Sequence, residues 1–326
     1  MLLLSACWLL SATTRSWNSN LLELVFPKYW PKPVYDFSKN PLTKQGIELG
    51  RRLFYDPVLS RDSTVSCSSC HLSFTAFTHV DHPLSHGIED RIGTRNSPVL
   101  TNLAWAKHFM WDGAVNHLDF QALAPIAHPA EMDNSIEKVV QKLREKASYK
   151  NWFFQAFGDS TVTGERLLKA LAQFELTLVS ANSKYDRMIF GQEKYTEQEQ
   201  NGYLLFQKNC ASCHVEPLFT NHDFEKNGLP LDTSLNDFGR MKITKLSTDS
   251  LKFKVPTLRN IEFSYPYMHD GRFKKLREVV NHYAKTTALD RKIELQPNEK
   301  VDLVAFLLTL TDREFLFNPD FSFPQD

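Results

Sequence analysis

Several features that mark other classes of protein are scarce in this sequence of 326 residues. Lys and Arg together number 38, as do Asp and Glu, so no net charge favours nucleic acid or an acidic surface as a partner. The apolar stretch at residues 1–10 is too short to span a bilayer. Glycine occurs only 12 times against 24 phenylalanines, which excludes a low-complexity chain and predicts a globular protein with an aromatic core.

Cysteine is scarce as well, and four of the five cysteines stand in two copies of one motif, Cys-x-x-Cys-His. The copies comprise Cys67, Cys70 and His71, and Cys210, Cys213 and His214. This motif is the attachment signature of c-type haem, because two thiols at this spacing reach both vinyl groups of one porphyrin and the histidine ligates the iron. A redox cysteine pair or half of a zinc site does not need a histidine directly after it, twice. The sequence therefore predicts two covalently bound haems.

The beginning of the chain predicts export. Residues 1–10 resemble the truncated end of a secretory signal, and residues 4–7 resemble a bacterial lipobox in which Cys7 becomes the lipidated first residue. Haem attachment to this motif in bacteria also takes place outside the cytoplasmic membrane. We therefore expect the periplasmic side of a bacterial envelope, with anchoring to the membrane through lipidated Cys7. A short apolar tail with a spare thiol is the alternative.

Apolar periodicity predicts a mainly α fold, because no segment shows sustained β alternation. The expected helices are 43–55, 135–148, 164–180, 196 to the second motif, 274–285 and 298–310. Residues 72–98 and about 215–254 are expected to be loops. Residues 11–40, which contain three prolines and little periodicity, are expected to be a tether.

An internal sequence repeat predicts that the chain has two related halves. Residues 95–100 and 110–113 are similar to residues 255–260 and 268–271, and each pair of segments follows one haem motif. We therefore expect two cytochrome c-like haem domains related by internal duplication. The expected divisions are a signal- or lipoprotein-like segment and tether at 1–40, an N-terminal haem domain at 41–190, a C-terminal haem domain at 191–315, and a tail at 316–326.

The sequence resembles the bacterial diheme cytochrome c peroxidase and MauG superfamily in the order and spacing of several segments. These are the repeated segments and residues 109–113, 121–125, 129–132 and 266–271. The resemblance covers residues 42 to 310. It implies an enzyme that reacts with hydrogen peroxide at its N-terminal haem.

For that haem, the resemblance implies that His71 is the proximal iron ligand, that Gln121 and Glu131 are distal polar residues, and that Pro125 shapes the site. Glu131 would take a proton from the first peroxide oxygen and return it to the leaving one, while Gln121 holds the bound oxygen. A solvated carboxylate before a helix is the alternative for Glu131.

Two further sites lie between the expected domains. The resemblance places Trp111 between the haems, where an indole relays an electron or packs as a core residue. It also implies a calcium ion held by Asn96 and the backbone carbonyls of Ser264 and Pro266, since calcium prefers hard oxygen ligands.

At the second haem His214 is the implied proximal ligand, and Tyr283 stands at the family's sixth-ligand position. MauG has tyrosine there, whereas peroxidases supplied by a cytochrome have methionine. A phenolate is a hard anionic donor that lowers the potential of the iron, which favours storage of two oxidising equivalents on the haem pair. Met268 is the competing ligand, and a Tyr283 that only packs is the remaining alternative.

Two details qualify the likeness to MauG. The segment 206–209 lacks the surface tryptophan through which oxidising equivalents leave MauG, so a route through Tyr203 or another residue must replace it. In the loop after the first motif, His79, His82 and His86 are candidates for a reversible sixth ligand, of which His86 matches best. A solvated loop histidine is the alternative.

The function expected from the sequence is therefore oxidation of Tyr or Trp residues on a partner protein, driven by peroxide and routed through the second haem. The first alternative is a cytochrome c peroxidase that removes peroxide with electrons from a small cytochrome or copper protein. The second is a diheme electron carrier without enzymatic activity, which has no need of a distal acid and base such as Gln121 and Glu131.

Overall fold

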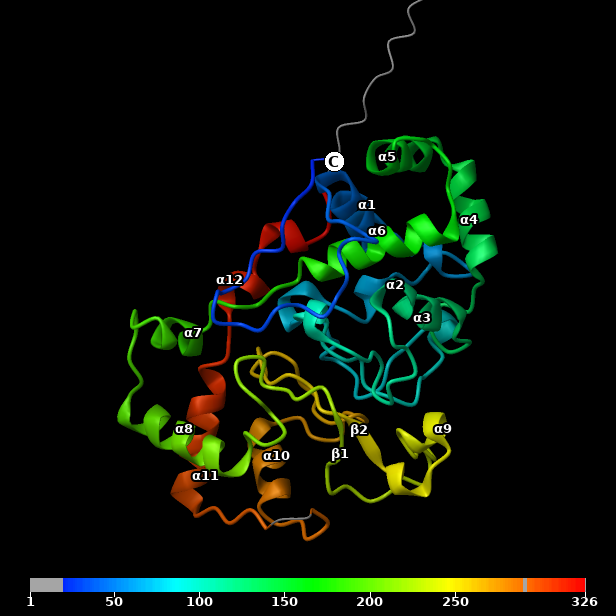
Figure 1. The fold of residues 1–326 in the computed structure, drawn as a ribbon. Coiled ribbons are helices and arrows are strands. Elements are labelled where there is room, and N and C mark those ends of the chain that lie inside the picture. The colour runs from blue at the N-terminus through cyan, green and yellow to red at the C-terminus, as the bar shows by residue number, and fades with distance from the viewer. Residues whose placement is uncertain (1–19, 290–291, 326) are drawn as a thin grey trace, which may run out of the picture.

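A computed structural model describes residues 20–289 and 292–325, and these residues form two mainly helical lobes (Figure 1). The mainly α prediction is confirmed. The first lobe contains α1 (Lys44–Tyr55), α2 (Leu118–Gln121), α3 (Leu123–Ala127), α4 (Ile136–Glu145), α5 (Ala147–Phe157) and α6 (Gly164–Leu176). The second contains α7 (Lys184–Ile189), α8 (Glu197–Asn209), β1 (Phe224–Lys226), α9 (Met241–Thr244), β2 (Lys252–Lys254), α10 (Leu276–Tyr283) and α11 (Pro297–Leu308). The chain then returns to the first lobe in α12 (Arg313–Leu316).

Three local predictions were wrong in detail. The helix expected at 135–148 is interrupted at Lys146, whose extended backbone separates α4 from α5, and α5 ends before Gly158 at a φ of 84°. The helix expected to reach residue 180 ends at Leu176. The loop expected at 215–254 contains an antiparallel pair, β1 and β2, whose three residues each are too few for alternation to be visible.

Each lobe is built on one close crossing of two helices, in which the first helix precedes a haem motif. In the first lobe Gly50 of α1 lies against α6, where an added Cβ would be 1.9 Å from the carbonyl oxygen of Ala170. In the second, Gly202 of α8 lies against α11, and its Cβ would be 1.9 Å from the carbonyl oxygen of Asp302. Both crossings need glycine because any side chain would force the helices apart.

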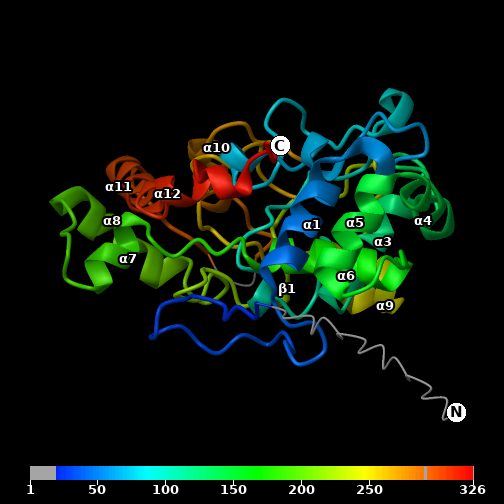
Figure 2. The same ribbon diagram turned by 90° about the horizontal axis from the view of Figure 1, so that it is seen from above.

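Both ends of the described chain pack on the body of the molecule (Figure 2). Residues 20–40 are irregular, as expected of a tether, but Trp30 is buried beside Trp105 with ring centroids 5.0 Å apart. Phe315 of α12 belongs to the core of the first lobe, and the Tyr55 hydroxyl of α1 donates to the carbonyl oxygen of Phe321 at 2.7 Å. The expected tail at 316–326 thus lies against the N-terminal half. Cys7 and the expected signal segment lie outside the described residues.

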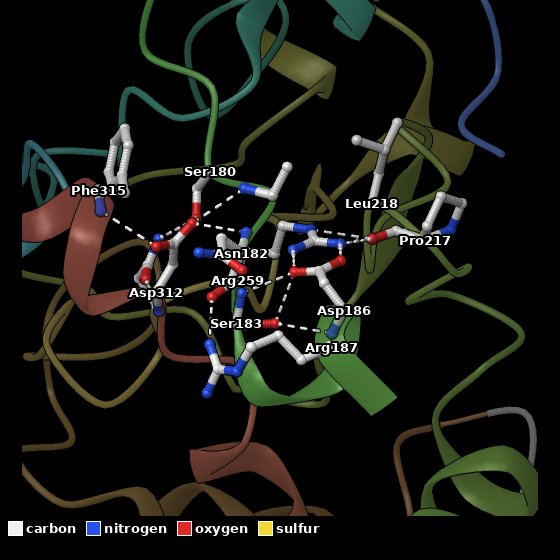
Figure 3. Close-up of polar contacts among 12 residues, drawn as sticks. Ser180, Asn182, Ser183, Asp186, Arg187, Pro217, Leu218, Arg259, Asp312 and Phe315 are labelled. Atoms are coloured by element: carbon white, nitrogen blue, oxygen red, sulfur yellow. Dashed lines mark hydrogen bonds and ion pairs between the residues drawn. The ribbon is translucent and has the colours of Figure 1, made fainter. Parts of the chain in front are cut away.

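The expected junction of the two haem domains, between residues 190 and 191, follows α7, and the chain enters α7 from a buried polar network (Figure 3). One oxygen of Asp312 accepts hydrogen bonds from Ser180 Oγ at 3.1 Å and from the backbone N–H groups of Ala181 and Asn182, each at 2.9 Å. The crossing between the lobes is therefore fixed by buried hydrogen bonds. Within the described residues, no helix is long and apolar enough to cross a membrane.

Glu175 is a buried carboxyl group in α6, and its burial predicts an unusual dependence of stability on pH. The side chain is 5% exposed, and burial raises its pKa from 4.5 to about 8. Between these values the folded protein binds more protons than the unfolded chain, so stability falls as pH rises from 4.5 to 8. We expect Glu175→Gln to increase the free energy of unfolding at pH 7 by up to about 3 kcal/mol and to change it little at pH 4.

The measurement is denaturant unfolding at both pH values, with Glu165→Gln on the exposed side of the same helix as control. The control should change stability little at either pH. If the free energy of unfolding of Glu175→Gln exceeds that of the unmodified protein by no more at pH 7 than at pH 4, the carboxyl group ionises normally in the fold.

Candidate haem-binding sites

A large cavity lies between the lobes and contains the second Cys-x-x-Cys-His motif. Its volume is about 620 Å³, and Cys210, Cys213 and His214 are among its lining residues. Most of the wall is apolar, with contributions from α10 and α11. The volume lies within the range of about 300–1,000 Å³ that small-molecule and cofactor sites occupy.

The two motifs have the same local structure. In the first, the N–H of His71 donates to the carbonyl oxygen of Cys67 at 3.0 Å, and in the second the N–H of His214 donates to that of Cys210 at 2.9 Å. None of these four cysteines forms a disulfide. Burial and the nearby Glu131 raise the pKa of the Cys70 thiol to about 11. A neutral Cys70 thiol in a fixed turn fits thioether attachment better than a redox pair, which needs a thiolate.

Both motif histidines are oriented for iron ligation through Nε2. His71 Nδ1 lies 2.6 Å from the carbonyl oxygen of Phe77, and His214 Nδ1 lies 3.1 Å from that of Phe219. A hydrogen bond from Nδ1–H to a carbonyl leaves Nε2 unprotonated for a metal, which is the usual arrangement of ligating histidines. Burial lowers the pKa of His71 to about 4, so its ring is neutral. These residues fit a haem at each motif.

The second site contains both candidates for a sixth ligand. Tyr283, at the end of α10, and Met268 line the same cavity as His214. Burial, and the proximity of Cys210 and Cys213, raise the pKa of the Tyr283 phenol. No described residue forms a hydrogen bond with this phenol, although a buried tyrosine hydroxyl normally has a partner. The phenol therefore has its oxygen free for a ligand in the cavity.

The first site brings together Cys70, His86 and Glu131. Cys70 Sγ lies 3.4 Å from the carbonyl oxygen of His86, and the adjacent Ile88 N–H donates to the carbonyl oxygen of Glu131 at 2.8 Å. Gly87 permits this contact, since a Cβ there would lie 2.3 Å from the carbonyl oxygen of Ala130. Burial raises the pKa of Glu131, while His128, 3.7 Å away, lowers it. A carboxyl group with a raised pKa beside the first motif suits general acid and base chemistry.

Gln121 and Pro125 lie on the short helices that lead to Glu131. The Gln121 amide at the end of α2 lies 3.8 Å from the sulfur of Met110. Pro125 is in α3, and its carbonyl oxygen accepts from the N–H of Met132 at 3.2 Å, which folds the segment that carries Glu131 back over α3.

Trp111 lies at the junction of the lobes and lines the cavity of the second motif. Its indole N–H donates to the carbonyl oxygen of Asn96 at 2.8 Å, while its own carbonyl accepts from the N–H of Lys254 at 2.8 Å. The side chain is thus held by the first lobe and the backbone by β2 of the second.

The three loop histidines form a stack. The ring centroids of His79 and His82 are 5.1 Å apart, and those of His82 and His86 are 4.1 Å apart. His86 Nδ1 also lies 3.4 Å from Asp90. The stack borders the first site through His86, while no group of three or more metal-ligating side chains occurs among the described residues.

The expected calcium residues lie on one wall of the cavity. Asn96, Ser264 and Pro266 all line it. The amide nitrogen of Asn96 donates to the carbonyl oxygen of Pro83 at 3.0 Å, which leaves the amide oxygen for another donor or a cation. These oxygens are neutral, as in sites that use carbonyl ligands for calcium.

Sequence reasoning missed Lys254 and the carbonyl groups of Phe77 and Phe219. The carbonyls carry no side-chain signal, although Phe77 and Phe219 each follow a motif histidine by five or six residues, a spacing that could have been noticed. Lys254 lies in a strand that was expected to be loop, so nothing in the sequence separated it from a surface lysine.

Comparison with known proteins gives consistent matches. A family model described as di-haem cytochrome c peroxidase matches residues 44–194. The methylamine utilization protein MauG of Methylorubrum extorquens is 36% identical, covering 86% of this chain and 82% of that protein. Cytochrome c551 peroxidase of Nitrosomonas europaea is 37% identical, covering 85% and 82%. A crystal structure of a MauG-like protein associated with microbial copper homeostasis has a TM-score of 0.84 at 31% identity, covering 93% of this chain and 99% of that one.

Proposed function

Because the chain belongs to the family of di-haem cytochrome c peroxidases and MauG proteins, and is therefore a di-haem oxidoreductase with two c-type haems, we propose a specific division of labour between its two sites. Cys67, Cys70 and His71 would hold a haem that supplies the iron for reaction with hydrogen peroxide, and Cys210, Cys213 and His214 would hold a haem that supplies a second store for the oxidising equivalents. These leave to a partner protein, whose Tyr or Trp residues are oxidised.

At the first site the haem supplies the iron on which peroxide is reduced. Glu131 would take a proton from one oxygen of hydrogen peroxide and return it to the other oxygen, which leaves as water. Burial of Glu131 supports this role, because the raised pKa makes its carboxylate a stronger base than an ordinary one. Gln121 would orient the peroxide, Pro125 would position the segment that carries Glu131, and His71 would ligate the iron.

One observation carries the MauG-like assignment, namely the phenol of Tyr283 without a hydrogen-bond partner in the described structure, in the same cavity as His214. A tyrosine ligand lowers the potential of the second haem and makes it a poor acceptor for electrons from an external cytochrome. Trp111 lies on the wall of that cavity, and we assign to its indole the transfer of electrons between the two sites. Tyr203, whose hydroxyl donates to Glu216 at 3.1 Å, is the proposed exit toward the partner.

We extend the proposal to the organisation of the chain. A duplicated cytochrome c-like unit is supported by two turns of the same form, in which Met110 and Met268 both have positive φ, of 67° and 74°, and Gly113 and Gly271 follow with φ of 69° and 66°. The domain divisions at 41–190 and 191–315 follow from this repeat. Calcium bound by Asn96, Ser264 and Pro266, export to the periplasmic side and anchoring through Cys7 complete the proposal.

The spectrum of the fully ferric protein after one equivalent of hydrogen peroxide tests the function. We expect a long-lived oxidised state involving both haems without prior reduction, followed by its decay when a protein rich in exposed Tyr and Trp is added. A reaction that requires one-electron reduction first supports the cytochrome c peroxidase instead, with His86 as the ligand that must leave. Two six-coordinate low-spin haems that peroxide never changes would leave only the electron carrier.

Tyr283→Met should raise the reduction potential of the second haem. A thioether stabilises the reduced iron relative to a phenolate, so the variant should accept electrons from a small cytochrome or copper protein more readily. Potentiometric titration followed by absorbance measures the change. Met268→Leu is the matched control, and a change of potential in Met268→Leu alone would assign the sixth ligand to Met268.

A further inference from the structure

Lys254 is a cationic side chain that the function described so far does not use. It is partly buried at the end of β2 and lines the cavity of the second motif. Among the described residues no carboxylate or other acceptor pairs with its ammonium group. Nearby lysines differ in this respect, since Lys252 lies 3.2 Å from Asp249 and Lys242 lies 3.3 Å from Asp237.

The same end of the cavity holds a second unsatisfied polar group. His222 lines the cavity, and its Nε2 is buried without a hydrogen-bond partner. The two residues are neighbours, because Phe224 pairs with Lys254 across the sheet and the N–H of Val255 donates to the carbonyl oxygen of Asp223 at 2.8 Å. Loss of hydration around Lys254 lowers its pKa to about 8. A cation and an imidazole left unpaired together indicate an anion that belongs between them.

The chemistry of the cavity's occupant supplies such an anion. A c-type haem carries two propionate carboxylates, and its vinyl groups are fixed to Cys210 and Cys213. Burying these carboxylates without a cation is costly, whereas pairing a lysine with one of them satisfies both charges.

We propose that the Lys254 ammonium forms an ion pair with a propionate of the second haem and so raises the potential of that haem. Lys254 is a positioning residue that makes two contacts, one through its side chain and one through its backbone. Its side chain holds the haem, and its backbone N–H donates to the carbonyl oxygen of Trp111 at 2.8 Å. The second haem and Trp111 are thereby held to the same residue of β2.

The test is potentiometric titration of the holoprotein and of Lys254→Met, Lys254→Arg and Lys245→Met. The second haem is identified as the one missing after both Cys210 and Cys213 are replaced by Ala. Removal of a cation favours the more positively charged oxidised iron, so Lys254→Met should lower its potential by at least about 59 mV, a tenfold change in the oxidised-to-reduced ratio. Lys254→Arg should keep the potential near that of the unmodified protein. Lys245, an exposed lysine that does not line the cavity, is the control and should have no such effect.

Infrared difference spectra between the oxidised and reduced protein provide a second measurement. The carboxylate bands of the propionates should shift in Lys254→Met and be restored in Lys254→Arg. An unchanged potential and unchanged carboxylate bands in Lys254→Met would overturn the proposal, as would equal shifts in Lys254→Met and Lys245→Met. These measurements need both haems but no peroxide. Their outcome therefore does not depend on whether the protein oxidises a partner.

Discussion

Glu131→Gln is expected to slow the reaction of the ferric protein with hydrogen peroxide by about 10²- to 10⁴-fold, the usual contribution of a positioned acid or base. The amide keeps the shape of the side chain but neither accepts the first proton nor returns it. Because the variant retains both haem motifs, its ferric spectrum should be unchanged. Stopped-flow absorbance with peroxide in excess measures the rate directly.

The dependence of this rate on pH separates chemistry from packing. Burial raises the pKa of Glu131 above its usual 4.5, so the rate of the unmodified protein should fall as pH is lowered through that raised value. Glu131→Gln should show no such fall. Glu137→Gln, at an exposed position at the start of α4, is the matched control and should react at the normal rate. If Glu131→Gln reacts as fast as the control, the acid and base must be sought elsewhere, beginning with His128 at 3.7 Å.

The sequence predicts most of the haem chemistry because that chemistry is encoded locally. A motif of five residues specifies two thiols and a ligand, and the structure repeats its turn at both places with the same hydrogen bonds. Trp111 belongs to a segment that recurs with His269 in its place, and its role between the haems stays a prediction. The family that these segments indicated is confirmed by the comparisons.

What the sequence does not predict depends on contacts between distant residues. Lys254 differs from Lys242 and Lys252 because it forms no ion pair with a carboxylate among the described residues. The extended backbone of Lys146 separates α4 from α5. Apolar periodicity does not reveal this break, since the apolar positions of both helices continue one pattern. Arg259 belongs to one of the repeated segments, but the sequence does not show that it pairs with Asp186, which lies 73 positions away.

Replacing Arg259 by Met is expected to destabilise the protein by about 3–5 kcal/mol, the cost of breaking a buried ion pair and leaving the other charge unpaired. Arg259 is fully buried, and its two terminal nitrogens each donate to an oxygen of Asp186 at 2.8 Å. It also donates through Nε to the carbonyl oxygen of Pro217 at 2.9 Å, and its guanidinium carbon lies 4.6 Å from the centre of the Trp30 ring. Figure 3 shows the pair beside the segment that joins the lobes.

Arg187→Met provides the matched control, because Arg187 belongs to the same segment but is more exposed. Its guanidinium lies 2.8 Å from Glu193, and its side chain is 39% exposed. Exposed pairs contribute at most about 1 kcal/mol, so the control should unfold nearly as the unmodified protein does. Urea unfolding followed by circular dichroism measures both variants.

The double variant Arg259→Met with Asp186→Asn decides what the pair does. If the cost of Arg259→Met comes from the stranded carboxylate, removing that charge should restore a substantial part of the lost stability. Burial alone would raise the pKa of Asp186, but Arg259 and neighbouring hydrogen bonds lower it, so this stability is present above about pH 4 and is lost as pH falls further. If instead the double variant is as unstable as Arg259→Met, the loss lies in the contacts of Arg259 with Pro217 and Trp30. Its role would then be to hold the N-terminal segment and the second haem motif in place, rather than to balance a charge.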